Sequence, residues 1–378
     1  MANNLVLVLD TGIGNLVIKF DAIGFLQSKG IYPEAVCTGP QAECLDLIGI
    51  KAQQLLSISD QRRFFKNKTI VFFFDCLRFN SLIAAFGSKV FIQLDDRVSI
   101  ARRFLYFSRA FWRLFGIHVS RIDYYAHEKV NNFRLIMEIL GNDKINDELL
   151  VDLCKPNYFA QLITQKLVSH KCELNLKGRP EDLVLLQCGV ANGLKSIKSP
   201  SPKKIAKIHD ELRKAKLQVV LVGGPADINF AKAVEAACEI EPELAVGQTS
   251  IKDIWQIASN SKCIISFDSS LGHIAAYLEI PLVWVGGCAA FSRSRPWSKP
   301  YLTHFVLCPT FFNFLSQNPI RESIALTFTN GTSPTDLIDN ADVTSAVIAI
   351  CGKAGWHKAH IANNRQPIPA EEVKNEIL

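Results

Sequence analysis

The segment SFDSSLGH, residues 266–273, places an acid, hydroxyls, a glycine and a histidine between two apolar runs. The run before it, CIISF (263–267), is typical of a buried strand, and the run after it predicts a helix that begins at His273. Hydroxyls and backbone amides at a helix N-terminus form an anion site, to which the helix dipole contributes. We therefore expect an anionic ligand here. A helix cap beside a buried histidine is the simpler alternative.

A second strand-to-loop junction carries cationic side chains. Gly189 follows the predicted strand LVLLQC (183–188), and Lys195 and Lys198 lie in the next loop. A lysine beside turn amides can neutralise a phosphate, and a solvated basic loop is the alternative.

A third junction in the same half of the chain is LVGGPAD, residues 221–227. The chain turns there through Gly223 and Gly224, with Asp227 at the start of the next predicted helix, where it is either a ligand-binding group or a cap. Ligands of open α/β sheets bind at the carboxyl ends of the strands. The three loops together predict a site large enough for a nucleotide.

The first loop of the chain, DTGIGN (10–15), joins the predicted strand LVLVLD to a predicted helix over Leu16–Gln27. Its glycines allow a sharp turn and the close approach of a ligand, or they form only a tight structural turn. The segment is not GxGxxG and no Walker lysine follows it, which argues against a nicotinamide-dependent oxidoreductase and a P-loop NTPase.

These loops sit in a strand–helix rhythm that occurs twice. The first series of predicted strands is LVLVLD, YPEAVCTG, TIVFFFD and KVFIQL, followed by a helix over 127–141 that ends at Gly141. The second series is LVLLQC, QVVLVGG, CIISF and LVWVGG. The pattern is that of parallel sheets covered by helices. We expect an N-terminal domain over 1–175, a C-terminal domain over 176–352 and a polar tail over 353–378.

Bulk composition fits a folded two-domain protein. The chain has 378 residues, 48% hydrophobic and 21% charged, with a net charge of +6. Its 11 cysteines form no CxxC pair and lie mostly in apolar runs, which indicates buried free thiols and neither a disulfide framework nor a zinc site. No apolar run is long enough to span a membrane.

Basic charge is concentrated in residues 97–121, where arginines alternate with aromatic residues and no acid is present. Such a segment suits an anionic lipid surface or a polyanionic acceptor. A half-buried helix with a solvated basic face is the alternative, and no motif supports nucleic acid.

In this order the segments resemble the bacterial heptosyltransferase family, glycosyltransferase family nine. The family hallmark D-[ST]-G-x-x-H-[LI]-A-A is similar to Asp268–Ala276, and its L-x-G-G-P-x-[DE] turn to Leu221–Asp227. Weaker similarities are a T-S-[LI]-x-[DE]-[LI] segment at Thr249–Ile254, a G-[DN] turn at Gly14-Asn15, an H-x-x-x-N segment from His127, and a loose match at Asp75–Ser81. The resemblance covers most of residues 5–350.

The resemblance implies a GT-B fold, an α/β architecture of two Rossmann-like domains that face each other across a cleft. It implies an inverting, metal-independent transfer of a sugar, typically from ADP-heptose, to the inner core of lipopolysaccharide or a related surface glycan. The protein would then work in the cytoplasm, in peripheral contact with the inner membrane, on an anionic glycolipid acceptor.

It also assigns roles to individual residues. Lys195 would meet the diphosphate, Asp227 and Thr249 would lie near the adenosine, and Asp268 would hold sugar hydroxyls. The other expected donor-binding residues are Gly189, Gly223, Gly224, Ser269, Ser270, Gly272 and His273. The expected acceptor-binding residues are Gly12, Gly14, Arg102, Arg103 and Arg109.

Two positions depart from the family pattern. Members often carry Asp where this chain has Asn15, and an amide cannot take the proton that an inverting transfer removes from the acceptor hydroxyl. Asp10 is then the first candidate for the general base, with Asp75, Asp95 and Asp96 as others. Ser270 stands where the family usually has Gly, which narrows the phosphate loop or alters donor choice. A different donor, a protein acceptor, or a non-catalytic nucleotide-sugar binder are the remaining alternatives.

Overall fold

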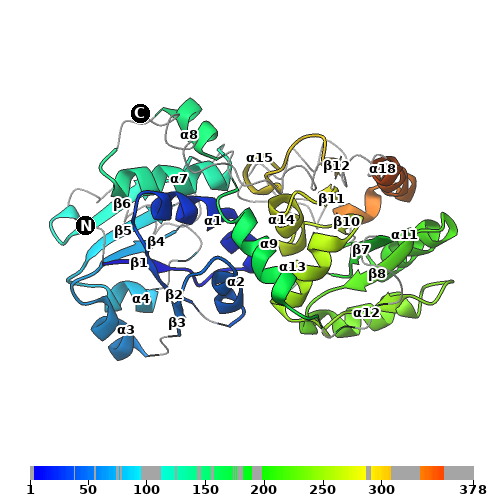
Figure 1. Ribbon diagram of the computed structural model, residues 1–378, viewed down its shortest axis with the longest axis horizontal. Coiled ribbons are helices and arrows are strands. Elements are labelled where there is room, and N and C mark those ends of the chain that lie inside the picture. Colours follow the sequence, from blue (N-terminus) through cyan, green and yellow to red (C-terminus); the bar gives the residue numbers. More distant parts are fainter. Residues whose placement is uncertain are drawn as a thin grey trace.

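Two parallel six-stranded sheets, each with helices around it, form this protein (Figure 1). The structure is a computed structural model. It describes residues 4–37, 39–54, 57–73, 76, 79–94, 112–123, 126–142, 146–154, 157–172, 174, 176, 182–189, 198–286, 291–307 and 333–352.

The N-terminal sheet has the strand order β3-β2-β1-β4-β5-β6, and all its neighbouring strands are parallel. The order reverses between β1 and β4, so the loop after β1 lies at the switch point where doubly wound sheets bind ligands. Its strands are β1 (Leu5–Val8), β2 (Glu34–Val36), β3 (Ala52–Gln53), β4 (Thr69–Phe72), β5 (Lys89–Leu94) and β6 (Ile117–Arg121).

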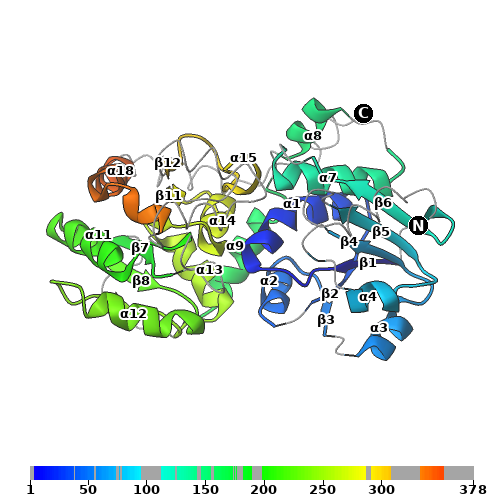
Figure 2. The same ribbon diagram turned by 180° about the vertical axis from the view of Figure 1, so that it is seen from behind.

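Helices cover both faces of this sheet, as Figures 1 and 2 show. They are α1 (Ile13–Ser28), α2 (Gln41–Leu47), α3 (Ile58–Phe65), α4 (Phe79–Ala84), α7 (Glu128–Ile139), α8 (Asp147–Leu153) and α9 (Ala160–Ser169). Alternate residues of β1 point to opposite faces: Leu5 and Leu7 join the core with α1 and α7, whereas Val6 and Val8 join the core with α3 and α4.

The C-terminal sheet repeats the same topology, in the order β12-β11-β10-β7-β8-β9, again with every pair parallel. Here the order reverses between β7 and β10, the two strands that lead into the Gly189 and Asp268 loops. The strands are β7 (Leu183–Gln187), β8 (Gln218–Val222), β9 (Glu243–Leu244), β10 (Cys263–Ser266), β11 (Leu282–Gly286) and β12 (Thr303–Leu307).

The helices around the second sheet are α11 (Pro202–Lys214), α12 (Ile228–Glu235), α13 (Ile251–Asn260), α14 (Ser270–Tyr277), α15 (Phe291–Ser294) and α18 (Asn340–Gly352), with 3₁₀ turns η2 (Pro225–Asp227) and η3 (Pro334–Leu337). Ser201 and Ser250 cap α11 and α13 through their hydroxyls, and Pro202 occupies the first position of α11. Both caps are local features of the sequence, and they fix where the two helices begin.

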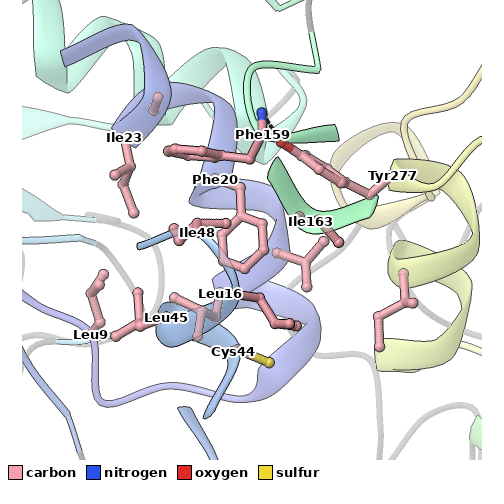
Figure 3. Packing of buried hydrophobic residues seen from close by; sticks show 14 of the residues in the cluster. Leu9, Leu16, Phe20, Ile23, Cys44, Leu45, Ile48, Phe159, Ile163 and Tyr277 are labelled. Carbon is pink, nitrogen blue, oxygen red and sulfur yellow. Dashed lines mark hydrogen bonds between the residues drawn. The ribbon is translucent and has the colours of Figure 1, made fainter. Parts of the chain in front are cut away.

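One hydrophobic core runs from the N-terminal sheet into the C-terminal sheet. At its centre Phe20 of α1 stacks on Trp255 of α13, with ring centroids 5.9 Å apart, and meets Tyr277 of α14 edge-on at 5.5 Å. Figure 3 shows the Phe20 ring close to Phe159 and Tyr277, with Leu16 and Ile163 nearby. Because these aromatic side chains are buried, the two halves are joined by a packed interface.

Most expectations about the fold are confirmed. The two sheets contain the eight strands that were expected, and each has two further strands at its edges, β3 and β6 in one and β9 and β12 in the other. The helix predicted over 127–141 ends as predicted, with Gly141 in the left-handed region at φ 83°. The division at residues 175 and 176 stays a prediction, and the tail over 353–378 lies outside the described residues. In the part of the chain that is described, no helix combines the length and the apolar character needed to cross a bilayer.

The cysteines also agree with the sequence. Nine of them lie in the described ranges, all as free thiols, and seven of these nine are buried. Cys288 and Cys308 lie outside those ranges.

Candidate functional site at the junction of the two sheets

The SFDSSLGH segment joins β10 to α14, and its helix begins three residues earlier than expected. Ser269 is the N-cap, its hydroxyl accepts from the amide of Leu271 at 3.3 Å, and Ser270 is the first helical residue. The expectation that His273 starts the helix is therefore wrong. A serine that caps a helix looks like part of a polar loop in the sequence, which is the reason for the shift.

Gln187, the last residue of β7, organises this loop. Its side-chain carbonyl accepts hydrogen bonds from the Ser266 hydroxyl (2.8 Å), the Phe267 amide (3.0 Å) and the Ser269 hydroxyl (2.5 Å). Sequence reasoning missed Gln187, although a polar residue at the end of an apolar strand was a signal of this role. A buried amide with several partners fixes a loop rigidly.

Asp268 forms an ion pair with Lys198, with its Oδ2 2.6 Å from Nζ. Asp268 is 6% exposed, so the lysine offsets much of the cost of burying the carboxylate. The sequence indicated Lys195 and Lys198 as candidate phosphate ligands. Lys198 is at the site, whereas Lys195 lies outside the described residues.

The Asp227 carboxylate lies between the loops that follow β7 and β8. Its Oδ2 accepts from the Gly224 amide at 3.1 Å and so caps the 3₁₀ turn η2, whereas its side chain makes no capping hydrogen bond to α12 within the described residues. A Cβ on Gly189 would lie 2.9 Å from Oδ1, and one on Gly223 would lie 3.2 Å from Oδ2. The two glycines are needed because the carboxylate fills the space beside them.

The remaining donor-side residues are at or near the same edge of the sheet. Thr249 is half-buried just before α13, after Gly247, which has φ 72°. Gly272 lies in the first turn of α14, where a Cβ would come within 3.0 Å of the Trp284 ring and 3.2 Å of the Ser266 hydroxyl. The backbone at the start of α14 therefore packs tightly on β10 and β11.

His273 is buried in the first turn of α14 and faces the other half of the protein. A Cβ on Gly14 would lie 2.9 Å from the His273 ring and 3.1 Å from the Ser270 Cα. Burial lowers the pKa of His273 to about 4, Asp268 opposes this shift, and the charges of Lys198 and Lys19 add to it. The imidazole is therefore neutral at neutral pH.

The DTGIGN segment meets this loop from the N-terminal side. Gly12 is the N-cap of α1 in an extended conformation, so Gly14 and Asn15 belong to the first turn of the helix, which starts earlier than the expected Leu16. The backbone carbonyl of Asn15 accepts from Nζ of Lys19 at 3.0 Å. Asp10 is half-buried at the end of β1.

A pocket opens beside this contact, between the two halves. Its lining comes from α1, β5, the end of β6, α7 and α15, and consists of Lys19, Gln93, Ile122, Glu128, Asn131, Asn132 and Arg293. Within the described ranges, the buried Asn132 Nδ2 has no hydrogen-bond partner. Sequence reasoning had singled out the segment from His127, but not Lys19 or Asn132.

The α15 segment bridges to α7 at this pocket. Arg293 Nε lies 3.1 Å from Glu128 Oε1, and the His127 Nε2 lies 2.7 Å from the Arg295 carbonyl. The His127 Nδ1 accepts from the Lys129 amide at 3.1 Å, so the neutral ring donates its Nε2 proton to Arg295. Burial lowers the pKa of His127 to about 3, which keeps the ring in this neutral form.

Several expected site residues lie outside the described ranges. On the acceptor side these are Arg102, Arg103 and Arg109, and among the candidate bases they are Asp75, Asp95 and Asp96.

A model of glycosyltransferase family 9 (heptosyltransferase) matches residues 104–306, which is just over half of the chain. The chain belongs to glycosyltransferase family 9. The resemblance seen in the sequence is thereby confirmed, and the match includes β10, the Asp268 loop and the α15 segment.

Curated relatives in this family come from Escherichia coli. One lipopolysaccharide heptosyltransferase 3 is 23% identical over 217 residues, which is 54% of this chain and 57% of the relative. A second, from strain K12, is 29% identical over 99 residues, 25% of this chain and 29% of the relative. The matched segments thus span between about a third and somewhat over half of the relatives' length.

Solved structures of family 9 members share the fold across nearly the whole chain. A family 9 glycosyltransferase from Veillonella parvula superposes with a TM-score of 0.61 at 13% identity, covering 93% of this chain and 98% of that one. The E. coli ADP-heptose lipopolysaccharide heptosyltransferase II gives 0.60 at 16% identity, covering 93% and 99%. The E. coli heptosyltransferase WaaC with ADP gives 0.58 at 14%, covering 87% and 99%. The GT-B fold expected from the sequence is therefore confirmed.

Proposed function

We propose that this family 9 member is an inverting glycosyltransferase. It would move a sugar from a nucleoside diphosphate donor, ADP-heptose first among them, onto a lipopolysaccharide core or a related surface glycan. The observation that carries the proposal is the Asp268–Lys198 pair at the N-terminus of α14, at the switch point of the C-terminal sheet. The names of the E. coli relatives support the choice of donor and acceptor.

In this mechanism the donor binds the C-terminal half. Lys198 and the first amides of α14 stabilise the diphosphate as the bond to the anomeric carbon breaks, and Asp268 holds hydroxyls of the sugar. Asp227, Thr249 and the glycines after β7 and β8 border the nucleoside. The acceptor hydroxyl approaches from the N-terminal half, where the α1 turn meets His273.

The acceptor in this proposal is an anionic glycolipid, and the enzyme works in the cytoplasm at the inner membrane. The arginine-aromatic segment 97–121 supports this part of the proposal, because cationic and aromatic side chains suit an anionic lipid interface. Nucleic acid is not a proposed partner.

Isothermal titration with ADP-heptose, GDP-sugars and UDP-sugars tests the donor site. We expect one donor to bind, and Asp268→Ala to weaken it at least about tenfold, since a lost charge-assisted hydrogen bond costs about 1.5–3 kcal/mol. Glu239→Ala is the matched control, because Glu239 is an exposed carboxylate paired with Lys214 at 2.7 Å elsewhere in the same half. If the wild-type protein binds none of these donors, the proposed function is wrong.

Asn15 favours a second candidate, a nucleotide-sugar binder without transferase activity. The expected difference is simple: a binder takes up the donor but forms no glycoside with any acceptor. If Asn15→Asp creates transfer that the wild-type protein lacks, the second candidate is correct for the natural chain.

A further inference from the structure

The proposed transfer requires a group that takes the acceptor proton, and the following inference rests on that proposed function. An amide at Asn15 cannot take it. Asp10 lies close enough to Cys37 for its charge to act on that thiol. Burial, and after it the charge of Asp10, raises the pKa of Cys37 to about 11. Asp10 therefore neighbours the end of β2, and it is not among the residues that line the pocket.

Glu128 is the carboxylate in the pocket lining of the described residues. It is the first residue of α7, and its side chain is 18% exposed, so it is sheltered from bulk water while still reachable from the pocket. An acid in this position also stabilises the helix N-terminus, which is the purely structural role it has to be distinguished from.

Groups around Glu128 suit the approach of a sugar. Arg293 fixes one carboxylate oxygen at 3.1 Å from its Nε, while Asn132 offers a buried amide donor without a hydrogen-bond partner in the described ranges. Arg293 comes from the C-terminal half and Glu128 from the N-terminal half, so the carboxylate is oriented only when the two halves meet as they do here.

We propose that Glu128 is the general base of the transfer. The acceptor hydroxyl gives its proton to a Glu128 oxygen while its own oxygen forms the bond to the anomeric carbon of the donor. The bond from that carbon to the diphosphate oxygen breaks, and its electron pair leaves with the nucleoside diphosphate. Glu128 then releases the proton to water. Arg293 orients the base, and Asn132 binds a hydroxyl of the acceptor sugar.

Glu128→Gln tests the assignment because it keeps the size of the side chain and removes its basicity. We expect the transfer rate with the bound donor to fall by about 100-fold or more, the usual contribution of a general base. The donor dissociation constant should stay within about twofold of the wild-type value, because the donor site does not use Glu128. Glu128→Asp should retain part of the activity.

Arg293→Gln is the matched control, because it breaks the same ion pair and leaves the carboxylate. If Glu128 only fastens the two halves, Glu128→Gln and Arg293→Gln should lose equal activity, and the double variant should lose no more. If Glu128 is the base, Glu128→Gln should be at least about tenfold slower than Arg293→Gln. Thermal melts of each variant show whether it is folded.

Three results would overturn the assignment. One is Glu128→Gln activity within a few-fold of wild type, and another is equal losses in the two single variants. The third is loss of transfer in Asp10→Asn while Glu128→Gln stays active, which would place the base on Asp10. Normal donor binding in all variants would leave the proposed function standing in each case. If the wild-type protein binds no donor, both the proposed function and the assignment of Glu128 are wrong.

Discussion

The ring of His273 packs directly on the backbone of Gly14, and this contact joins the first loop of the N-terminal half to the anion-binding loop of the C-terminal half. Both residues lie in the first turn of their helices, α1 and α14. The N-termini of two helices therefore meet at one place, and each contributes the positive end of its dipole. An anionic ligand bound at the N-terminus of α14 would consequently also be stabilised by the dipole of α1.

Gly14→Ala should separate these two helix starts. The new methyl group would lie 2.9 Å from the His273 ring and 3.1 Å from the Ser270 Cα, and the backbone atom cannot move easily. We expect the variant to lose about 1–3 kcal/mol of unfolding free energy, despite the better helix propensity of Ala. The shift in the urea midpoint measures this loss.

Gly12→Ala is the natural control, because a Cβ there has no atom within 4 Å and its φ of −65° suits any residue. As an N-cap substitution it should cost less than about 1 kcal/mol. Equal losses at positions 12 and 14 would mean that the contact with His273 does not matter for stability.

Tyr277→Phe should weaken the junction at the other end of α14. The Tyr277 hydroxyl donates to Asp21 Oδ1 at 3.3 Å and accepts from the Phe159 amide at 3.2 Å, the bond drawn in Figure 3. Asp21 is itself buried in a 2.5 Å ion pair with Lys129. We expect a loss of about 1–3 kcal/mol, because the variant leaves a buried amide without its acceptor.

Tyr158→Phe provides the comparison in the same cluster, since Tyr158 contacts Asp21 through its backbone amide at 3.1 Å and keeps that bond. Unfolding in urea, followed by tryptophan fluorescence, reports on both variants. A Tyr277→Phe protein as stable as Tyr158→Phe would show that the hydroxyl is not important for holding the halves together.

The sequence predicted the elements and the loops because their signals are local. Apolar runs bounded by glycine define β7, β8 and β10, and parallel strands bring their carboxyl ends to one edge. Asp227, Asp268 and Lys198 therefore reach the site as their positions indicated. Two helix starts were misplaced, because Ser269 and Gly12 occupy the N-cap positions. The four edge strands β3, β6, β9 and β12 were not predicted at all.

The contacts between the halves were beyond local reasoning. Glu128 and Arg293 are 165 residues apart, and no pattern in either segment predicts their contact. One signal was nevertheless present: Lys19 and Asp21 lie in the otherwise apolar helix LVIKFDAIGF, and buried charges need partners. The structure gives Asp21 the ion pair with Lys129 and gives Lys19 the carbonyl of Asn15.

Gln187→Leu should disturb the donor loop without removing any group that is proposed to contact the donor. The Ser266 and Ser269 hydroxyls and the Phe267 amide would lose their common acceptor. We expect at least about a tenfold loss of donor affinity by titration calorimetry, because each unsatisfied buried group costs about 1–3 kcal/mol. Gln248→Leu, at an exposed glutamine whose side chain donates to the Leu244 carbonyl at 3.2 Å, should bind the donor normally. Unchanged donor affinity in Gln187→Leu would mean that the loop keeps its conformation without the hydrogen bonds to the Gln187 side chain.

Stability should fall as the pH is lowered from about 6.5 toward 4, because His127 and His273 are buried in neutral form. Burial lowers their pKa values to about 3 and about 4, whereas in the unfolded chain both titrate near 6.5. The unfolded state then binds more protons in this window, so acid favours unfolding, and the stabilisation is fully present above about pH 6.5. Each histidine contributes a slope of about 1.4 kcal/mol per pH unit within the window.

His127→Asn isolates one of these two slopes, because Asn can still cap α7 while it cannot take up a proton. Urea midpoints between pH 5 and 6 should therefore depend less steeply on pH in this variant than in the wild-type protein. His304→Asn, at an exposed histidine of β12, is the matched substitution, and it should leave the slope set by the buried histidines at its wild-type value. If His127→Asn keeps that slope as well, His127 is protonated in the folded protein at pH 5. Its Nδ1 would then be unable to accept from the Lys129 amide, and the N-terminus of α7 would be capped in another way.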